Sequence, residues 1–497
     1  MRNVGLVGTT VGESSGGPDF SGRPDTGRRA RSTPVAPERL AEELAGVLPD
    51  GAVVADPDLL ASYRHDQALG VPAGEPAVAV FPRTTEQVQA VMRVAFAGGV
   101  PVVPRGAGSG LSGGANAVDG CIVLCLDRMD AIRAIRPADG YAEVEPGVVN
   151  DRLRQAARAH GLDYAPDPAS KDWCTIGGNI ATNAGGLCCV KYGVTREAVL
   201  GLEVVLADGR LARIGRRSVK GVAGYDLVGL FVGSEGTLGV VTGARVRLRP
   251  APPPPTTVVA VFAELTAAGR AVEKIMAVGT PSLLELMDAA TLRAVEDFTP
   301  MGLDTSAAAL LVAQTDLPGA AGEAEADAFL AACMAVGATE GYRSEEPAEA
   351  EMLLGARRMA FPALERLGVA TLDDIAVPRS RLAEMMSEIG RIAAEHDVLI
   401  GTFGHAGDGN LHPTIVHPHG DTEAAVRARA AFEDILRTAV RLGGTVTGEH
   451  GVGLIKRGAL AAELDPGAAH LHTLVKRALD PTGILNPGKA LPALSPR

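Results

Sequence analysis

Residues 104–116 read PRGAGSGLSGGAN and contain a literal G-x-G-x-x-G at Gly108, Gly110 and Gly113. In the βαβ unit of a Rossmann fold, such a run must open a helix. Here the next apolar segment, CIVLCL at residues 121–126, follows so soon that no helix fits between the two. The spacing therefore excludes a Rossmann site and predicts a strand, a glycine-rich loop and a second strand.

A loop of this composition can bind an anion through its backbone. Successive N–H groups that no side chain covers form a concave nest for a pyrophosphate. Arg105 adds positive charge, and Ser109 and Ser112 add hydroxyl groups. A second stretch, TIGGNIATNAGG (175–186), lets the backbone approach another part of the same ligand. The alternative is that both stretches are flexible turns, but strand-like sequence after each loop favours binding.

Length and composition limit the classes of protein to consider. The chain has 497 residues, enough for two or three domains. Its formal charge of −12 gives no net basic field for nucleic acid. No apolar run approaches the ~20 residues that a membrane-spanning helix needs. Six cysteines without a C-x-x-C pair argue against a thiolate zinc site or an iron–sulfur cluster, so we expect a reduced, cytoplasmic protein, with peripheral membrane association left open.

Changes in amino-acid composition and in hydrophobic pattern divide the chain into four parts. Residues 1–38 are rich in Gly, Ser, Pro and Arg and predict a disordered tail. Capped helices and short strands alternate through residues 39–252. The run APPPPTT (251–257) breaks both helix and sheet, so it marks a boundary. Alanine-rich helices and apolar strands then predict an α/β or α+β domain over residues 258–443, and residues 444–497 return to Gly- and Pro-punctuated sequence.

The stretch GHAGDGNLH (404–412) predicts a hairpin, because Asp408-Gly409 is a strong turn signal between two apolar runs. If these two residues form the turn, His405 lies directly opposite His412. Opposed Cβ atoms are roughly 4.5–5.5 Å apart. Two imidazoles on one face can then hold a metal ion.

Two ligands rarely suffice for a metal, so a third is needed. TGEHGVG (447–453) supplies Glu449 in another glycine-framed turn, with His450 beside it. Two histidines and one glutamate leave an open position for substrate, as catalytic zinc sites do. The alternative, that these histidines cap turns and bind nothing, stays open on the residues alone.

Several segments together resemble one family. RGAGSGLSGG (105–114), GGNIATNAGG (177–186) and GSEGTLGVVT (233–242) are similar to the FAD-binding segments of the vanillyl-alcohol-oxidase-type flavoproteins. KYGVTREAVLGLEVVLADG (191–209) and VKGVAGYDL (219–227) resemble the glycolate oxidase and D-lactate dehydrogenase branch. The resemblance implies an α+β fold with a two-subdomain FAD-binding domain, a ferredoxin-like substrate or cap domain that carries the hairpin, and a C-terminal segment that packs back on the FAD domain.

The resemblance also implies the cofactor and the residues that hold it. Some relatives attach flavin through a histidine in the first loop, which this chain lacks, or a cysteine in the second. Cys174 precedes the second loop here, but the branch resembled binds FAD non-covalently. The implied FAD-binding residues are Arg105, Gly106, Ala107, Gly108, Ser109, Gly110, Ser112, Asp167, Gly177, Gly178, Asn179, Thr182, Asn183, Gly185, Glu235, Gly236, Val240 and Asn486.

The hairpin and the GEHGVG turn resemble the C-terminal signatures of D-2-hydroxyacid dehydrogenases in this branch. There the corresponding residues bind a divalent metal, commonly zinc, which makes His405, His412 and Glu449 the implied ligands. His450 is then the implied base. A metal on the substrate would lower the hydroxyl pKa, His450 would take the proton, and Cα would deliver hydride to flavin N5.

An arginine is expected for the substrate carboxylate, because guanidinium binds carboxylates bidentately. Arg357 and Arg358 lie in a segment where family members carry a substrate arginine after a tryptophan, although this chain has Leu354 there. We predict Arg357, and two solvated helix arginines are the alternative. Hydroxyglutarate-specific members have Lys and Asn near Leu372 and Thr414, so a smaller acid such as lactate or glycolate is favoured.

The predicted function is FAD-dependent oxidation of a D-2-hydroxyacid to the 2-oxoacid. No NAD site is evident, so electrons would leave for a quinone, a carrier protein or dioxygen. A homodimer and an iron–sulfur partner subunit stay open as partners. The rival functions are a subunit of a glycolate-oxidase-type complex, an alkyl-dihydroxyacetone-phosphate-synthase-like enzyme without net oxidation, and a metal-dependent binding protein or hydrolase without flavin.

Overall fold

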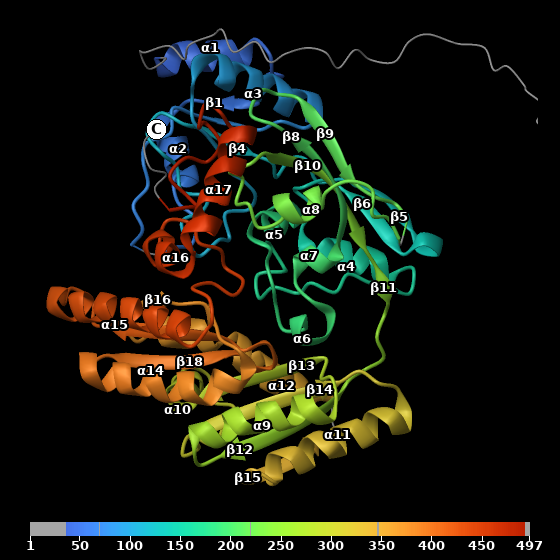
Figure 1. Ribbon diagram of the computed structural model, residues 1–497, viewed down its shortest axis with the longest axis vertical. Helices are drawn as coiled ribbons and strands as arrows, with labels where there is room; N and C mark the ends of the chain where they lie inside the picture. The colour runs from blue at the N-terminus through green and yellow to red at the C-terminus, as the bar shows by residue number, and fades with distance from the viewer. Residues whose placement is uncertain (1–35, 69, 219, 345–346, 493–497) are drawn as a thin grey trace, which may run out of the picture.

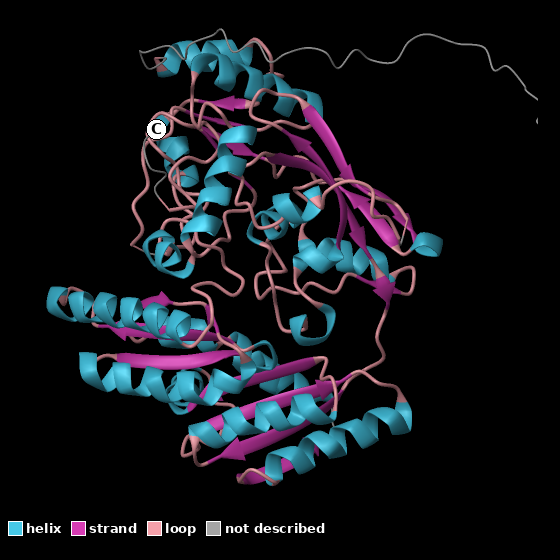
Figure 2. Cartoon of the chain, viewed as in Figure 1, coloured by secondary structure: helices cyan, strands magenta, loops and turns pink. Residues whose placement is uncertain are grey.

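The computed structural model describes residues 36–68, 70–218, 220–344 and 347–492, which form an upper and a lower part in Figure 1. The upper part holds two sheets from the first half of the chain and the last helices, and the lower part holds one large sheet. Helices cover the sheets in both parts (Figure 2), which confirms the α+β class. Residues 1–35 of the predicted tail lie outside the described residues, whereas Pro37 and Glu38 already belong to the first helix, α1 (Pro37–Ala45).

The first sheet carries the glycine-rich loop at the end of strand β3. Its strand order is β1-β2-β4-β3, and β2, β4 and β3 run parallel. Residues 106–121, between β3 and β4, form no helix, which confirms that the loop is not a Rossmann turn. The strands are β1 (Val53–Val54), β2 (Val78–Val80), β3 (Val102–Arg105) and β4 (Ile122–Cys125).

Helix α3 (Thr85–Gly98) packs with α1 on one face of this sheet. Its apolar residues recur at helical spacing, so Val88, Val91 and Ala95 are buried against the strands. The Thr84 hydroxyl caps the helix by accepting the N–H of Gln87 at 3.3 Å. The helix ends at Gly98, and Gly99 is the left-handed cap residue.

The second sheet is antiparallel, with the order β5-β6-β10-β8-β9. It packs on the short helices that carry the second glycine-rich stretch, and it shares one apolar core with them. The strands are β5 (Ile132–Arg136), β6 (Tyr141–Val144), β8 (Val199–Val205), β9 (Leu211–Gly215) and β10 (Val240–Arg247), and the helices are α4 (Asn150–Arg158), α5 (Ile176–Thr182), α7 (Thr195–Ala198) and α8 (Leu227–Phe231). A two-stranded ribbon of β7 (Leu162–Asp163) and β11 (Arg249–Pro250) lies beside it.

After the proline run the chain builds the third sheet, an eight-stranded one. Its main order is β15-β12-β14-β13-β18-β19-β16, and β17 also pairs with β19. All neighbouring strands are antiparallel. The strands are β12 (Thr256–Phe262), β13 (Leu283–Asp288), β14 (Ala309–Thr315), β15 (Ala338–Ser344), β16 (Val369–Leu372), β17 (Ile375–Ala376), β18 (Leu399–His405) and β19 (Asn410–His417).

Helices cover both faces of this third sheet and build a separate apolar core on each. One face packs on α9 (Leu265–Val278), α11 (Gly319–Met334), α14 (Leu382–His396) and α15 (Thr422–Arg441). The other face packs on α10 (Ala289–Phe298), α12 (Pro347–Arg358) and α13 (Ala360–Glu365). Alternation along the strands therefore sends every second side chain of β13 and β18 toward α12 and α13.

The last segment of the chain returns from the third sheet to the first. Helix α16 (Arg457–Glu463) lies near α15, and α17 (Pro466–Leu479) lies in the upper part (Figure 1). The N–H of Val102 in β3 donates to Ile484 O at 2.8 Å, and the N–H of Asn486 donates to Val102 O at 2.8 Å. The C-terminal residues thus lie beside the strand that leads into the glycine-rich loop.

Two further features complete the described chain. No helix in the described ranges combines the length and apolarity needed to cross a bilayer. The remaining short elements are α2 (Pro57–Leu60), α6 (Cys189–Tyr192), η1 (Ala61–Tyr63), η2 (Pro137–Asp139), η3 (Arg379–Arg381) and η4 (Ala406–Asp408).

Candidate functional site

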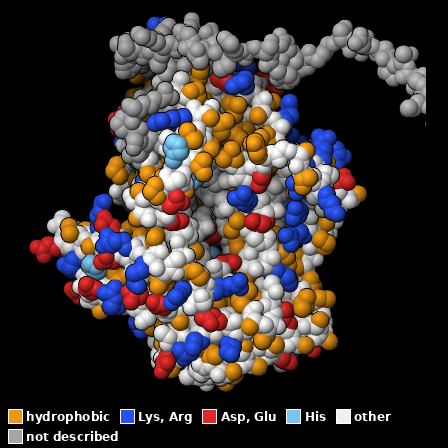
Figure 3. Space-filling view, in the orientation of Figure 1, with side chains coloured by type: hydrophobic (Ala, Val, Ile, Leu, Met, Phe, Trp, Pro, Cys, Tyr) orange, Lys and Arg blue, Asp and Glu red, His pale blue; other side chains and the backbone are white. Residues whose placement is uncertain are grey.

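A cavity of about 860 Å³ lies where the glycine-rich loops of the upper part face the third sheet of the lower part. Its volume is in the range that cofactor sites occupy. The surface is hollowed between the two parts (Figure 3). The lining comes from residues 104–115, 167–187 and 231–241 above, and from residues 351–372, His405, His412, Glu449 and His450 below.

The first glycine-rich loop turns back on the residue that precedes it. Gly108 has φ +77°, and a Cβ there would overlap the Arg105 guanidinium. The N–H groups of residues 107–111 meet no acceptor in the described part of the chain. Arg105 Nη1 is buried and also lacks a hydrogen-bond partner within the described ranges. Since buried donors are normally paired, this loop fits the pyrophosphate of FAD.

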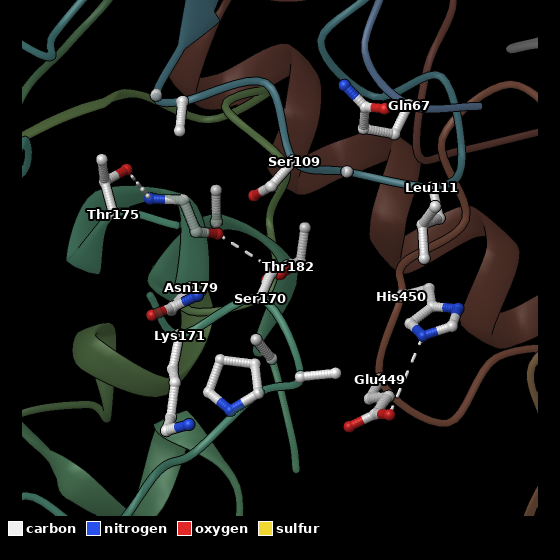
Figure 4. Close-up of a pocket in the computed structure, with 18 of the residues that line it drawn as sticks. Gln67, Ser109, Leu111, Ser170, Lys171, Thr175, Asn179, Thr182, Glu449 and His450 are labelled. Atoms are coloured by element: carbon white, nitrogen blue, oxygen red, sulfur yellow. Dashed lines mark hydrogen bonds and ion pairs between the residues drawn. The ribbon is translucent and has the colours of Figure 1, made fainter. Parts of the chain in front are cut away.

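The second loop lies on the same wall. Thr175 caps α5 by accepting the N–H of Gly178 at 3.3 Å. Figure 4 shows Thr175 and Asn179 across the cavity from Glu449 and His450. The predicted residues that line this part of the cavity are Gly177, Gly178, Asn179, Thr182 and Gly185, together with Asp167, Gly236 and Val240 from neighbouring segments.

Four predicted cofactor residues have other contacts. Asn183 adopts a left-handed conformation, accepts the N–H of Arg196 and is not part of the cavity wall. Asn486 is also absent from the wall, and its amide donates to Gly114 O at 2.9 Å and Glu235 O at 2.7 Å. Ser112 and Glu235 do line the cavity, but their side chains bond to the turn that carries His450.

We call these contacts the clasp, formed by Ser112, Glu235 and Asn486. The Ser112 hydroxyl donates to Gly451 O at 2.8 Å. The Glu235 carboxylate accepts the N–H groups of Val452 and Gly453 at 2.8 and 2.9 Å. The flavin-side loops therefore hold the turn that brings Glu449 and His450 into the cavity. A glutamate at left-handed φ +50° is a signal that only the structure reveals.

The histidine hairpin forms, but its predicted register is wrong. His405 pairs with Asn410, and His412 pairs with Phe403. The turn takes in Ala406–Asp408 as η4 and Gly409 as the left-handed residue, so it has four residues rather than two. The shift of two positions keeps both histidines on one face, because side chains alternate with period two. Their ring centroids lie 5.2 Å apart.

Glu449 lies between the two histidines. Its Oε1 is 3.1 Å from His405 Nε2 and 3.3 Å from His412 Nε2. Ligand atoms bound tetrahedrally to zinc at 2.0–2.1 Å are roughly 3.4 Å apart. The potential ligand atoms of all three residues lie within 4.8 Å of one another. This set of two imidazoles and one carboxylate fits a divalent metal.

The electrostatics of the three residues agree with such a site. Burial alone would lower the pKa of His405, but Glu285 and Glu449 outweigh it and hold this pKa well above its usual value. Burial would raise the pKa of Glu449, yet His405 and His412 hold it well below the ordinary range. The carboxylates around His405 therefore favour a positive charge at this position.

Asp374 fixes the turn at Glu449. Its Oδ2 accepts the N–H groups of Gly448, Glu449 and His450, each at 2.9 Å. Its other oxygen, Oδ1, accepts the Asn410 amide at 2.8 Å. Both carboxylate oxygens are thus engaged, so Asp374 orients the turn rather than offering a metal ligand.

His450 lies next to the metal-ligand set. Its ring stacks on His412 with centroids 5.1 Å apart and an interplanar angle of 10°. Burial lowers the pKa of His450 to about 4, despite the opposing charge of Asp374. The imidazole is therefore neutral near pH 7, which is the state a proton acceptor requires.

The two candidate arginines differ in their surroundings. Arg357 is buried at the cavity wall, its guanidinium lies 4.5 Å from the Phe403 ring centroid, and it ion-pairs with Glu285. Arg358 also reaches the cavity but is more exposed and pairs with Glu351 at 2.7 Å. Glu285 was missed from the sequence, although a charged residue inside the apolar strand LLELMD is a readable signal.

Comparisons with known proteins agree with this geometry. Residues 76–215 match the FAD binding domain family, and residues 251–490 match the family FAD linked oxidases, C-terminal domain. Glycolate oxidase subunit GlcD of Bacillus subtilis is 43% identical over 416 residues, 83% of this chain and 88% of the relative. D-lactate dehydrogenase of Archaeoglobus fulgidus is 35% identical over 437 residues, 86% of this chain and 95% of the relative.

Solved structures share the fold at lower identity. 4-Ethylphenol oxidase from Gulosibacter chungangensis superposes with a TM-score of 0.76 at 19% identity, covering 94% of this chain and 99% of that one. Alkyldihydroxyacetonephosphate synthase gives 0.71 at 16% identity, covering 92% and 86%. At these identities the matches show the fold alone, and they confirm the flavoprotein architecture. The chain thus belongs to the FAD-linked oxidase family, in the branch of the GlcD subunits and D-lactate dehydrogenases, and is an FAD-linked oxidoreductase.

Proposed function

We propose that the protein oxidises a small D-2-hydroxyacid to the 2-oxoacid in the cavity between its two parts. The observation that carries this proposal is convergence: the unpaired amides of the first loop, the histidine–glutamate set and Arg357 all line one cavity. When bound, FAD would take up the hydride and a divalent metal would act as a Lewis acid on the substrate hydroxyl. Relatives named glycolate oxidase subunit and D-lactate dehydrogenase support this substrate class.

His450 would accept the hydroxyl proton. Its neutral imidazole lies beside Glu449, with Nε2 3.8 Å from Glu449 Oε1, so it adjoins the position where the metal would hold the hydroxyl. Asp374 and the clasp fix the backbone on either side of His450. A positioned base of this kind contributes typically 10²–10⁴-fold to the rate.

Arg357 would hold the substrate carboxylate. Its Nε is engaged by Glu285, so the two Nη groups stay available for a bidentate contact. The apolar residues of this wall are Phe361, Pro362, Leu372 and Phe403, and Glu351, Arg358 and Glu365 also line it. Since Arg358 is already paired with Glu351, a second substrate carboxylate gains little here, which supports an acid such as lactate or glycolate.

A second candidate role is that of the flavoprotein subunit of a glycolate-oxidase-type complex. The relative from Bacillus subtilis is named a subunit, and the six cysteines include no C-x-x-C pair, so an electron-accepting iron–sulfur cluster would belong to another chain. This role concerns the acceptor, for which a quinone, a carrier protein and dioxygen are the alternatives. It leaves the proposed half-reaction unchanged.

His405→Ala tests the proposal. The variant removes one imidazole from the metal-ligand set while leaving the glycine-rich loops intact. We expect purified protein to retain flavin absorbance, to lose bound divalent metal by elemental analysis and to lose turnover of D-2-hydroxyacids. His417→Ala, at the end of the neighbouring strand β19, is the matched control and should behave as wild type. Full turnover by His405→Ala in metal-free buffer would refute the metal role.

A further inference from the structure

Glu285 is a buried carboxylate with an apolar residue on each side of it in its strand. It lies in β13 at 1% exposure, and its neighbours Leu284 and Leu286 are 1% and 0% exposed. Removing a carboxylate from water costs several kcal/mol unless charged partners and hydrogen bonds compensate. The side chain points to the face of the third sheet that packs on α12 and α13, which is also the face of His405 and Phe403.

Two residues of the site meet this one carboxylate. Glu285 Oε1 lies 2.6 Å from His405 Nδ1 at hydrogen-bond geometry, and Oε2 lies 2.6 Å from Arg357 Nε in an ion pair that lacks hydrogen-bond geometry. The sheet itself fixes the first contact, because Glu285 and His405 are directly paired across β13 and β18. The second contact comes from the last turn of α12. Each oxygen thus serves a different partner.

We infer that Glu285 is a positioning residue that sets the orientation of the metal ligand His405 and of the substrate-binding Arg357 together. This inference rests on the proposed function. One side chain would then couple the metal site to the site that binds the substrate carboxylate.

For His405, the contact decides which ring nitrogen is free. The Glu285 carboxylate favours a proton on Nδ1, at 2.6 Å, and so leaves Nε2 as the nitrogen that would bind a metal; Nε2 lies 3.1 Å from Glu449 Oε1. Carboxylates in this position fix the tautomer and the ring angle of a metal-binding histidine, and losing one typically weakens metal binding 10–100-fold. His412 lacks an equivalent: its Nδ1 is 3.8 Å from Asp374 and has no hydrogen-bond partner within the described ranges.

For Arg357, the contact fixes one edge of the guanidinium. Phe403 lies under its face at 4.5 Å, and Glu285 engages Nε. The edge that remains is the Nη pair, and Arg357 lines the cavity. Because both partners of Glu285 line the same cavity, a shift of its carboxylate would displace the imidazole of His405 and the guanidinium of Arg357 together.

The test compares three variants of the flavin-loaded protein. Glu285→Gln keeps the shape but turns one oxygen into an amide donor, which can satisfy only one of the two partners. Glu285→Asp keeps the charge and withdraws the carboxylate from both. Asp288→Asn is the matched control, because Asp288 is a half-buried carboxylate at the end of the same strand that accepts the N–H groups of Thr291 and Thr402 instead.

Two readouts separate positioning from simple stabilisation. The first is Zn²⁺ affinity of chelator-treated protein, measured against a fluorescent chelator without substrate. The second is KM and kcat at saturating Zn²⁺ with the D-2-hydroxyacid that reduces wild-type flavin fastest. For Glu285→Gln we expect Zn²⁺ binding 10–100-fold weaker and KM about 10-fold higher even at saturating Zn²⁺. Asp288→Asn should lower the unfolding temperature and leave both readouts within twofold of wild type.

A double variant tests the link to the arginine. Arg357→Lys loses the Nε contact, so adding Glu285→Gln should raise KM by less than the product of the two single effects. If Glu285→Gln does not fold, Glu285→Asp carries the same test and should shift both readouts in the same direction.

The outcomes keep the two proposals apart. Wild type that binds no Zn²⁺ and is reduced by no D-2-hydroxyacid overturns the proposed function. Wild type that does both, with Glu285→Gln and Glu285→Asp matching it in Zn²⁺ affinity and KM, overturns only the role of Glu285. Loss of stability without a change in either readout overturns that role as well, because a purely structural carboxylate behaves in that way.

Discussion

At the scale of single residues, His450 gives the clearest dependence on pH. A base must be unprotonated in the free enzyme, and burial lowers the pKa of His450 to about 4. Its base form therefore persists as the pH falls from 8 to 5, and kcat/KM should fall only as the pH approaches 4. The measurement is the pH profile of kcat/KM with a D-2-hydroxyacid. An acidic limb centred near 6.5, where an exposed imidazole titrates, would show that the burial of His450 does not control its chemistry.

The sequence predicted which side chains lie together better than it predicted their individual contacts. His405, His412, Glu449 and His450 meet in one place, as their spacing around glycine-rich turns suggested. Ser112, by contrast, bonds to the turn at His450 rather than pointing a free hydroxyl at an anion. A hydroxyl can bond equally well to a bound anion or to a neighbouring backbone group. Which of the two it meets depends on the fold, which here brings together residues 338 positions apart.

At the scale of secondary-structure elements, the hairpin shows both the value and the limit of pattern reasoning. Apolar alternation on each side of Asp408-Gly409 predicted two strands and a turn, and both strands are present. The sequence did not reveal that the turn would include Ala406 and Gly407 as a 3₁₀ segment. A one-residue slip would have separated the histidines, whereas the actual shift of two kept them on one face.

The first glycine-rich loop predicts a specific loss of flavin. Gly108→Ala adds a Cβ that would collide with the Arg105 guanidinium and distort the unpaired amides of residues 107–111. We expect purified Gly108→Ala protein to contain less than half of the wild-type flavin, measured by absorbance at about 450 nm relative to 280 nm.

The control for backbone strain is Gly120→Ala. Gly120 has φ +69°, similar to Gly108, but a Cβ there meets open space, and the residue is not part of the cavity wall. Both variants carry the cost of a left-handed alanine, roughly 1 kcal/mol. Only Gly108→Ala should lose flavin. Equal flavin content in the two variants would remove this loop from the cofactor site.

The clasp predicts how stability changes with pH. Burial raises the pKa of Glu235 to about 7, against the opposing effect of the N–H groups of Val452 and Gly453. Between pH 4.5 and 7 the unfolded chain loses this proton while the folded protein keeps it, so folding takes up a proton. The contribution of Glu235 to the free energy of unfolding must then fall as the pH rises through this window, by about 3 kcal/mol in total.

The measurement is urea unfolding of wild type and Glu235→Gln from pH 4 to pH 8. The stability of wild type relative to Glu235→Gln should decline over this range and level off above pH 7. Glu340→Gln, an exposed position on β15, controls for the change in net charge and should give no such trend. A difference that is constant from pH 4 to pH 8 would mean that Glu235 is ionised throughout.

At the scale of the whole molecule, composition and the proline run predicted two parts of different composition on either side of residues 251–257. They did not predict how the two parts contact each other. The contacts that join them connect distant residues, such as Asn486 with Gly114 across 372 positions and Glu235 with Val452 across 217. No local pattern encodes such pairs. The resemblance to a known family supplied the missing arrangement, and the solved structures confirm the shared fold.

The arrangement also explains why the site lies between the parts. The glycine-rich loops offer unpaired backbone donors, and the third sheet offers charged side chains from β13, β18 and β19. Each part supplies what the other lacks, and the returning C-terminal segment brings Glu449 and His450 into contact with both. We therefore expect function to require the intact chain.

The proposed half-reaction can be observed in an anaerobic titration of the purified, metal-loaded protein, followed by its flavin absorbance. D- and L-lactate, glycolate and D-2-hydroxyglutarate are added separately. We predict a yellow protein that is bleached by D-lactate or glycolate, with release of one equivalent of 2-oxoacid per flavin, and no bleaching by L-lactate. A yellow protein that no 2-hydroxyacid bleaches, or one that L-lactate reduces as fast as D-lactate, would contradict the proposed function.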